Sequence, residues 1–304
     1  MINNRIRKRH TLKISRNGQK QNDFVRLMLF ASALVIVTIW SYWPIIVDLF
    51  KEWQRNDDYS AGQLVPLIAV FLVWHKRKEL RKCFLTPCWW GIALLVLAYL
   101  GRSYGLLFMY ESAQRYSLVL TIAGLVLLVA GWQVFRTLSW ILLFLFLMVP
   151  FPGRVHNLIS GPLQRAATTG SVFLLEAFGV NVSQNGNVVT LNEQTTMAVE
   201  EACSGLRMLT AFIIIAGFIA FMVKRSRTQK AIVFLSSIPV AVMCNIIRLC
   251  ITAILFIHVN AEIAEKFFHD FAGFCMMPAA VLLIFGLLWL MDKIIIAEPD
   301  KKGT

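Results

Sequence analysis

Long apolar blocks separated by short charged segments dominate this chain of 304 residues. The blocks run for about 15 to 25 residues, the length that a helix needs to cross the roughly 30 Å hydrocarbon core of a bilayer. Hydrophobic residues make up 58% of the chain and charged residues 15%, whereas soluble domains carry charge on about a quarter of their positions. Barrel strands would alternate apolar and polar residues over about ten positions, so the pattern excludes a barrel. The sequence therefore predicts an all-α polytopic membrane protein.

The apolar blocks define about eight transmembrane helices within a single membrane domain, 24–292. The spans are placed at 24–47, 61–75, 89–107, 114–132, 138–152, 206–223, 230–257 and 271–291, between cytoplasmic tails at 1–23 and 293–304. Basic residues gather in the two tails, in 75–82, around Arg136 and in 224–230. Because Lys and Arg are retained on the cytoplasmic side, eight spans place all of these segments there. The net charge of +13 follows from this topology, and we expect contact with the lipid bilayer and no nucleic-acid partner.

The segment 153–205, between the fifth and sixth spans, is predicted to be extracytoplasmic. Its first part, 154–178, contains Arg154, Arg165 and Glu176, and a charge at the middle of a bilayer costs roughly 2.5–3.5 kcal/mol. We interpret this part as an amphipathic or re-entrant helix; a full crossing would invert the side on which the following residues lie. The next part alternates β-favouring and polar residues around "QNGN", which predicts a small β-hairpin cap.

Cys203 lies where a polar run, "TTMAVEEACSGLRML", turns into the sixth apolar block. At a helix N-terminus, unsatisfied N–H groups and the helix dipole favour a thiolate over a thiol. Gly205 leaves room beside the thiol for another backbone to approach, and Arg207 adds positive charge one turn on. The pattern predicts a reactive thiol, with a structural cysteine as the alternative.

The other cysteines have no such setting. They are Cys83, Cys88, Cys244, Cys250 and Cys275. The first two flank a cytoplasmic turn with a spacing that does not suit zinc, and the last three lie in apolar helices, where cysteine behaves as a small hydrophobic residue. We therefore expect no metal and no organic cofactor.

The seventh span carries polar residues on one helical face. Asn245, Arg248 and Thr252 are spaced i, i+3 and i+7, which places them together. An arginine at that depth is costly unless it faces the bundle interior or a wet cavity, so a functional role is the default interpretation. An interhelical salt bridge is the structural alternative.

A histidine opens the eighth span on the predicted outer side. His269 and Asp270 stand in "AEKFFHDFAGF", and Glu265, one turn earlier, is placed to orient the imidazole ring. The topology brings this histidine to the outer half of the bundle with Cys203 and Arg248. His258, at the end of the seventh span, competes for the same role.

A thiol, a buried cation and a histidine together suit one chemistry. A thiolate attacks a peptide carbonyl, a fixed cation stabilises the oxyanion, and a histidine gives a proton to the leaving amine. The main alternative is a transporter or channel with an intramembrane Arg/Asn anion site, although the spans show no inverted repeat. A thiol–disulfide protein would need a second cysteine on the outer side, and a non-catalytic assembly subunit would leave the polar residues unexplained.

Three ordered motifs resemble the exosortase/archaeosortase family of membrane transpeptidases. They are "EEACSGLRML" with Cys203, "NIIRL" with Arg248 and "FHDFAGF" with His269. The stretches "DDYSAGQLVPLIAVFLVWHKR" and "VPFPGRVHNLISGPLQ" extend the resemblance over nearly the whole chain. One departure is Ala61 in "YSAG", where the family often has a histidine; this weakens a catalytic role for that loop.

The resemblance implies a function and a set of site residues. Cys203 would be the nucleophile, Arg248 the oxyanion or substrate clamp, and His269 the acid–base. The supporting residues are Ser204, Gly205, Arg207, Asn245 and Asp270. The implied partners are secreted proteins whose C-terminal tails hold a short motif, a membrane helix and a basic cluster. The enzyme would cut these tails on the extracytoplasmic face of the cytoplasmic (inner) membrane, through a thioacyl intermediate, and pass the protein to an amine acceptor at the cell surface.

Overall fold

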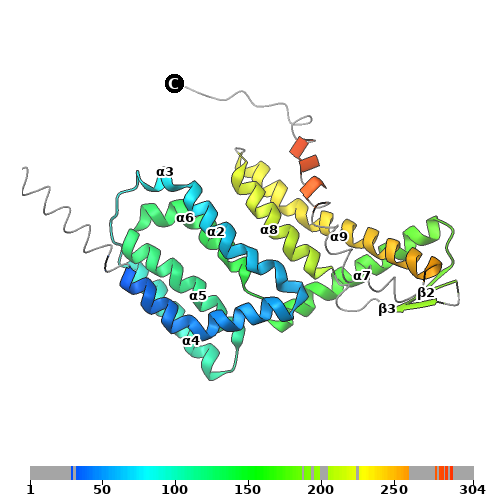
Figure 1. The fold of residues 1–304 in the computed structure, drawn as a ribbon, viewed down its shortest axis with the longest axis horizontal. Helices are drawn as coiled ribbons and strands as arrows, with labels where there is room; N and C mark the ends of the chain where they lie inside the picture. The colour runs from blue at the N-terminus through cyan, green and yellow to red at the C-terminus, as the bar shows by residue number, and fades with distance from the viewer. Residues whose placement is uncertain are drawn as a thin grey trace, which may run out of the picture. The chain divides into compact units, whose positions relative to one another are not determined.

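The computed structural model describes most of the chain between residues 32 and 259 (Figure 1). The described residues are 29, 32–186, 188–192, 195–198, 205–223, 226–259, 278, 281–283, 285–286 and 288–289. They divide into two compact units, one formed by residues up to Leu49 with Arg77–Leu142, the other by Phe50–Lys76 with the residues from Leu143 onward. Each unit is described separately below.

The first unit is a helical layer built on one antiparallel helix pair. Its elements are residues 32–49 of the helix Ser32–Arg55, α3 (Arg77–Leu80), α4 (Trp90–Leu107), α5 (Glu111–Leu125), the π-helical turn η2 (Val126–Ala130) and most of α6 (Trp132–Phe144). The last turn of α4 lies close to α5 because it contains a glycine, Gly105, in contact with α5. A Cβ on Gly105 would lie 2.5 Å from Cγ of Gln114, so only glycine fits there.

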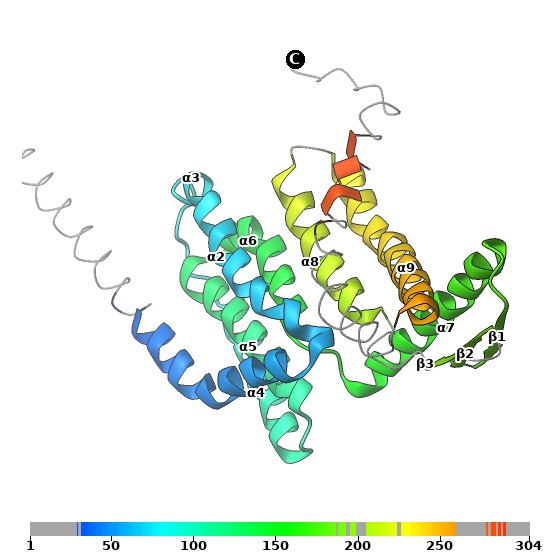
Figure 2. The same ribbon diagram turned by 45° about the vertical axis from the view of Figure 1, so that its right-hand side comes forward.

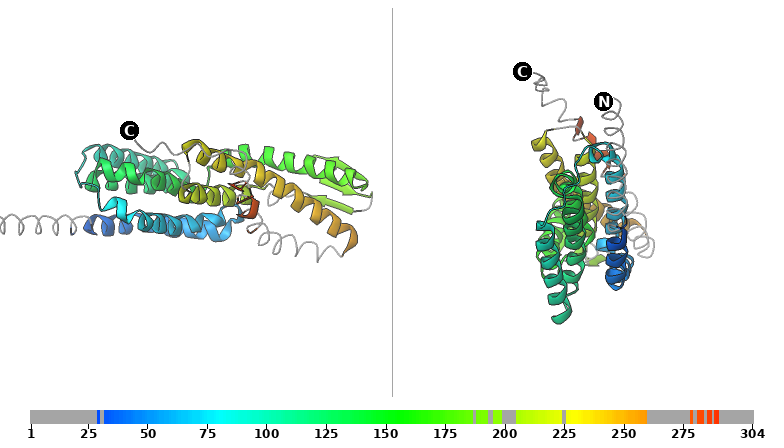
Figure 3. Two further views of the ribbon diagram at one scale, coloured as in Figure 1. Left: turned by 90° about the horizontal axis from the view of Figure 1, so that it is seen from above. Right: turned by 90° about the vertical axis from the view of Figure 1, so that its left-hand side faces the viewer.

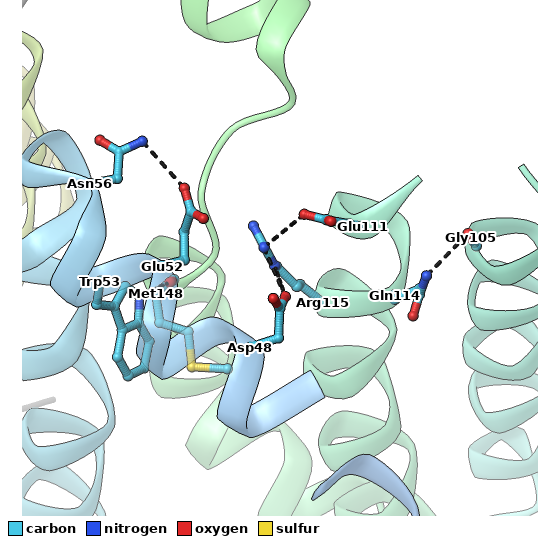
Figure 4. Close-up of polar contacts among 9 residues, drawn as sticks. All are labelled: Asp48, Glu52, Trp53, Asn56, Gly105, Glu111, Gln114, Arg115 and Met148. Carbon is cyan, nitrogen blue, oxygen red and sulfur yellow. Dashed lines mark hydrogen bonds and ion pairs between the residues drawn. The ribbon is translucent and has the colours of Figure 1, made fainter. Parts of the chain in front are cut away.

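A buried arginine joins α5 to Asp48 of the helix Ser32–Arg55 in the first unit. Arg115 is 5% exposed. Its Nε and Nη2 donate to Oδ2 of Asp48 at 3.0 and 2.8 Å, and Nη2 also donates to Oε2 of Glu111 at 2.9 Å (Figure 4). A charge removed from water is tolerated when carboxylates hold its protons. The pair therefore fixes the packing of α5 in this unit.

A second set of polar contacts joins α4 and α5 to the same helix, Ser32–Arg55. Arg102 donates from Nη1 to Oγ of Ser41 at 2.7 Å and from Nη2 to the Ser41 carbonyl at 2.8 Å, and its guanidinium carbon lies 4.5 Å from the centre of the Tyr42 ring. The Tyr42 hydroxyl lies 2.8 Å from Oγ1 of Thr121. These bonds satisfy polar groups that the apolar pattern alone does not reveal.

The second unit contains the remaining helices and the sheet. Its elements are the 3-10 helix η1 (Asp57–Gln63), α2 (Leu64–His75), η3 (Leu145–Met148), α7 (Gly153–Ala177), β1 (Val182–Asn185), β2 (Val188–Leu191), β3 (Thr195–Ala198), α8 (Leu206–Met222) and α9 (Arg227–His258). Helices α8 and α9 lie side by side, and α7 packs along α9 (Figure 2). α9 begins with a capping box, in which Oγ of Ser226 accepts from the Gln229 backbone N–H at 3.3 Å.

The predicted hairpin is present and has a third strand. The sheet is antiparallel with the order β1–β2–β3, and its first two strands join at Gly186, whose φ is +63°. Val189 and Leu191, alternate residues of β2, are 1% and 0% exposed and pack against Leu249 and Ala253 of α9. The sheet thus caps α7 and α9 at one end (Figure 3).

Four helices in the described part of the chain are long and apolar enough to cross a membrane. They are Ser32–Arg55, Trp90–Leu107, Glu111–Ala130 and Thr228–His258. A bent pair, Trp132–Met148 with Gly153–Ala177, adds a fifth if it forms one broken span, while α8 is apolar but has only 17 residues. A multi-pass helical protein is confirmed. The number eight stays a prediction, and most of the expected span 271–291 lies outside the described residues.

Two predicted boundaries are wrong. The first span was expected to end at residue 47, but its helix continues to Arg55, because Lys, Glu, Gln and Arg end a membrane span without ending a helix. Arg136 was expected in a loop, yet it lies within α6. The chain turns earlier, at Gly131, whose φ of +86° ends the preceding helical turn.

Candidate functional site

The start of α8 is the centre of the candidate site. Gly205 is the N-cap residue, is buried, and has φ +77° and ψ +2°, a left-handed conformation that favours glycine. α8 begins at Leu206, so Cys203 precedes the N-cap by two residues. Cys203 and Ser204 lie outside the described residues, as do His269 and Asp270. The structure therefore describes the start of α8, and the roles of Cys203 and His269 stay predictions.

The polar face of α9 contacts this helix start. Asn245, Arg248 and Thr252 are 1%, 5% and 1% exposed, which confirms that the face points into the protein. A Cβ on Gly205 would lie 2.7 Å from Nδ2 and 3.0 Å from Cγ of Asn245. The structure thus brings into direct contact two of the supporting residues, Gly205 and Asn245, which are 40 positions apart in the sequence.

Arg248 lies one turn further along the same face of α9. α9 continues from Arg248 to His258, so Arg248 lies well away from the end of the helix. Oγ1 of Thr252 donates to the Arg248 carbonyl at 2.9 Å, which means that this hydroxyl serves its own helix. Of the three polar residues on this face, Asn245 and Arg248 are the two that the sequence predicted at the site.

The loop before α2 holds α8 from another direction. Nη1 of Arg207 lies 3.2 Å from Oδ2 of Asp57, and Oγ1 of Thr210 donates to the Asp58 carbonyl at 2.8 Å. Arg207 was expected to supply positive charge to the thiol; in the structure it shares that charge with Asp57. Ala61, a residue of η1, is 5% exposed. η1 therefore contributes contacts that hold the first turns of α8.

A histidine that the sequence did not single out, His156, contacts η1. His156, in the first turn of α7, has its Nδ1 2.9 Å from Oη of Tyr59 and its Nε2 3.9 Å from Oδ2 of Asp58. Tyr59 is 97 positions away in sequence, so no local spacing reveals the pair. The only signal is that His156 falls on the stripe of α7 that buries Gln164 and Ser171.

The remaining described cysteines do not resemble nucleophiles. Cys244 and Cys250 are 2% and 9% exposed, and Sγ of Cys250 lies 3.7 Å from the Ser171 carbonyl. Cys83 is half-buried in the first unit, with its Sγ 3.6 Å from the Glu79 carbonyl. Within the described residues, no group of three or more His, Cys, Asp or Glu side chains is placed to hold a metal ion.

These features define a multi-pass helical membrane protein with an inward polar face beside the start of a short apolar helix. The family model of transmembrane exosortases (Exosortase_EpsH) matches residues 53–286, which include η1, the whole of α7 to α9 and the segment with Cys203. The chain belongs to the transmembrane exosortase family. No curated protein and no solved structure matches it. Membership confirms the resemblance drawn from the three motifs and supports a membrane transpeptidase-type role.

The contact between Gly205 and Asn245 predicts the effect of adding one methyl group. Gly205→Ala is expected to lower the free energy of unfolding by about 1–2 kcal/mol from the left-handed backbone alone. The displaced Asn245 side chain, buried at 1% exposure, adds to this cost. Thermal unfolding of the detergent-solubilised protein measures the change.

Two further variants separate the two causes. In an Asn245→Ala background the methyl group meets less resistance, so the cost of Gly205→Ala is expected to shrink toward the backbone contribution. Gly161→Ala on α7 is the matched control: no heavy atom lies within 4 Å of its added Cβ, and its φ is not positive. Equal effects of alanine at 161 and 205 would contradict the assignment.

Proposed function

We propose that the chain is a cysteine transpeptidase that removes C-terminal sorting tails from secreted proteins on the extracytoplasmic face of the cytoplasmic membrane. The observation that supports this most directly is the contact of Asn245 with Gly205, the N-cap residue of α8, two residues after Cys203 in sequence. Arg248, a buried cation, lies on the same face of α9 as Asn245, and the chain belongs to the transmembrane exosortase family.

The proposed reaction has two steps, and the first forms a thioester on Cys203. The Cys203 thiolate attacks the carbonyl carbon of the scissile peptide bond, an S–C bond forms, and negative charge moves to the carbonyl oxygen. Arg248 stabilises that charge, with Asn245 holding the start of α8 in place. The C–N bond then breaks, and the leaving amine takes a proton from His269.

The second step returns the enzyme to its starting state. An acceptor amine attacks the thioester carbon and loses its proton to His269, the S–C bond breaks, and the thiolate leaves as the new amide forms. Transfer regenerates every group of the site, so no metal and no organic cofactor enters the cycle. The acceptor we propose is an amine on a cell-surface molecule.

The proposal is tested with a secreted protein from the same genome that ends in a short motif, an apolar helix and a basic cluster. Co-expression with the wild-type chain is expected to shorten this protein by the mass of its tail. In isolated membranes that hold the wild-type chain, iodoacetamide treatment before the substrate is added is expected to stop the reaction, because only the free thiolate attacks. An intact tail together with anion uptake into vesicles would favour the transporter instead.

A further inference from the structure

One cluster of titratable side chains in the second unit has no part in the proposed reaction. Its members are Tyr59 and Asp58 on η1 and His156 on α7. The Tyr59 hydroxyl is within hydrogen-bond distance of Nδ1 of His156, at 2.9 Å, and the rings lie 5.9 Å apart. Nε2 of His156 lies 3.9 Å from the Asp58 carboxylate, longer than a hydrogen bond. The tyrosine–histidine bond is therefore the strong link between η1 and α7.

The cluster is shielded from solvent. Tyr59 is 7% exposed, and the side chains of His156 and Asp58 are 18% and 12% exposed. The Tyr59 ring also packs edge-on against Phe151, with centroids 6.3 Å apart. Burying a polar group costs free energy unless it is hydrogen-bonded. The Tyr59 hydroxyl and Nδ1 of His156 therefore depend on each other as partners.

The residues of η1 that hold α8 neighbour Tyr59 directly. Asp57 pairs with Arg207 in the first turn of α8, and the Asp58 carbonyl accepts from Thr210 one turn on. Asp58 thus faces His156 with its side chain and α8 with its main chain. η1 is a seven-residue 3-10 helix, a short element with poor internal geometry that depends on its neighbours for its position.

We propose that His156 and Tyr59 are positioning residues: they lock η1 onto α7, so that Asp57 and Asp58 hold the first turns of α8 and with them the segment that carries Cys203. In this proposal neither side chain touches the reacting atoms, and their effect reaches the thiol through η1 and the first turns of α8. The inference rests on the proposed function only because it names Cys203 as the residue whose position the two side chains control.

The test measures the rate at which iodoacetamide alkylates Cys203 in the full-length detergent-solubilised protein, peptide by peptide, by mass spectrometry. This readout needs no substrate, so it stands even if tail removal is never observed. Tyr59→Phe removes the hydroxyl at nearly constant shape, and His156→Leu removes the other partner. Both are expected to change the Cys203 rate in the same direction, by about three- to tenfold, the effect of one buried hydrogen bond.

A conservative variant and the labelling of two buried cysteines separate a positioning role from a general loss of packing. His156→Asn keeps a polar atom where Nδ1 lies and is expected to restore the wild-type rate. Cys244 and Cys250, buried in the same unit, are expected to stay unreactive in every variant. Tyr104→Phe and His75→Asn, at exposed positions, are the matched controls and are expected to have no effect.

Three results would overturn the proposal. The first is an unchanged Cys203 rate in Tyr59→Phe and His156→Leu. The second is a parallel rise in labelling of Cys244 and Cys250, which would show a loosened unit. The third is a failure of His156→Asn to differ from His156→Leu, since the hydrogen bond would then not be the cause.

Discussion

Replacing Cys203 by alanine is expected to slow tail removal by at least about 1,000-fold, because the variant loses the proposed nucleophile. Cys203→Ser is expected to be nearly as inactive, since a serine hydroxyl in place of the thiol is not ionised at neutral pH. The measurement is the mass of a tailed substrate after co-expression. A stable adduct between wild-type Cys203 and the cut substrate, found by mass spectrometry and absent from both variants, would identify the intermediate.

The other cysteines supply the controls for this experiment. Cys250→Ala removes a buried thiol whose nearest acceptor is the Ser171 carbonyl, and Cys83→Ala removes a half-buried thiol in the first unit. Both are expected to retain tail removal and, in the first case, to lose some stability. Wild-type activity in Cys203→Ala would overturn the proposed function, whereas loss in all three variants would point to unfolding.

Block length and local spacing predicted most of the helices. α4, α8 and α9 begin and end within a few residues of the expected spans, because an apolar run of membrane length leaves a helix as the structure that bonds every backbone group internally. "QNGN" predicted the hairpin because the turn needs a left-handed residue, which Gly186 provides. The inward face of α9 followed from the i, i+3, i+7 spacing.

The contacts that join distant segments could not be predicted. Arg115 and Asp48 are 67 positions apart and Tyr59 and His156 are 97 apart, and no local period records such pairs. β3 was also missed, since Thr195–Ala198 gains its strand conformation from pairing with β2 and not from its own composition.

The site was predicted more fully by resemblance than by pattern. Spacing placed Asn245 and Arg248 on one face of α9, but only the motif order connected that face to the segment with Cys203. The structure then supplied a physical reason for the connection: a side chain at Gly205, two residues after Cys203, would collide with Asn245. The roles of Cys203 and His269 stay predictions.

Replacing Arg248 by glutamine is expected to lower the rate of tail removal by at least about 100-fold, the cost of losing one donor to a developing oxyanion. Arg248 is 5% exposed, so its guanidinium acts where water does not screen it. Arg248→Lys keeps the charge but loses the planar fork of donors, and it is expected to recover only part of the activity. Single-turnover rates at saturating substrate measure the effect on the chemical step.

Controls on the same helix separate this role from folding and from transport. Thr252→Val, one turn further along the same face, removes a hydroxyl that bonds only its own helix in the described contacts, and it is expected to keep the wild-type rate. The anion-transport alternative makes the opposite prediction for one pair of variants. It requires Arg248→Gln to abolish anion flux while Cys203→Ala leaves flux intact. The transpeptidase requires both variants to lose tail removal, and iodoacetamide to label Cys203 in Arg248→Gln, because removing the oxyanion donor leaves the thiol in place.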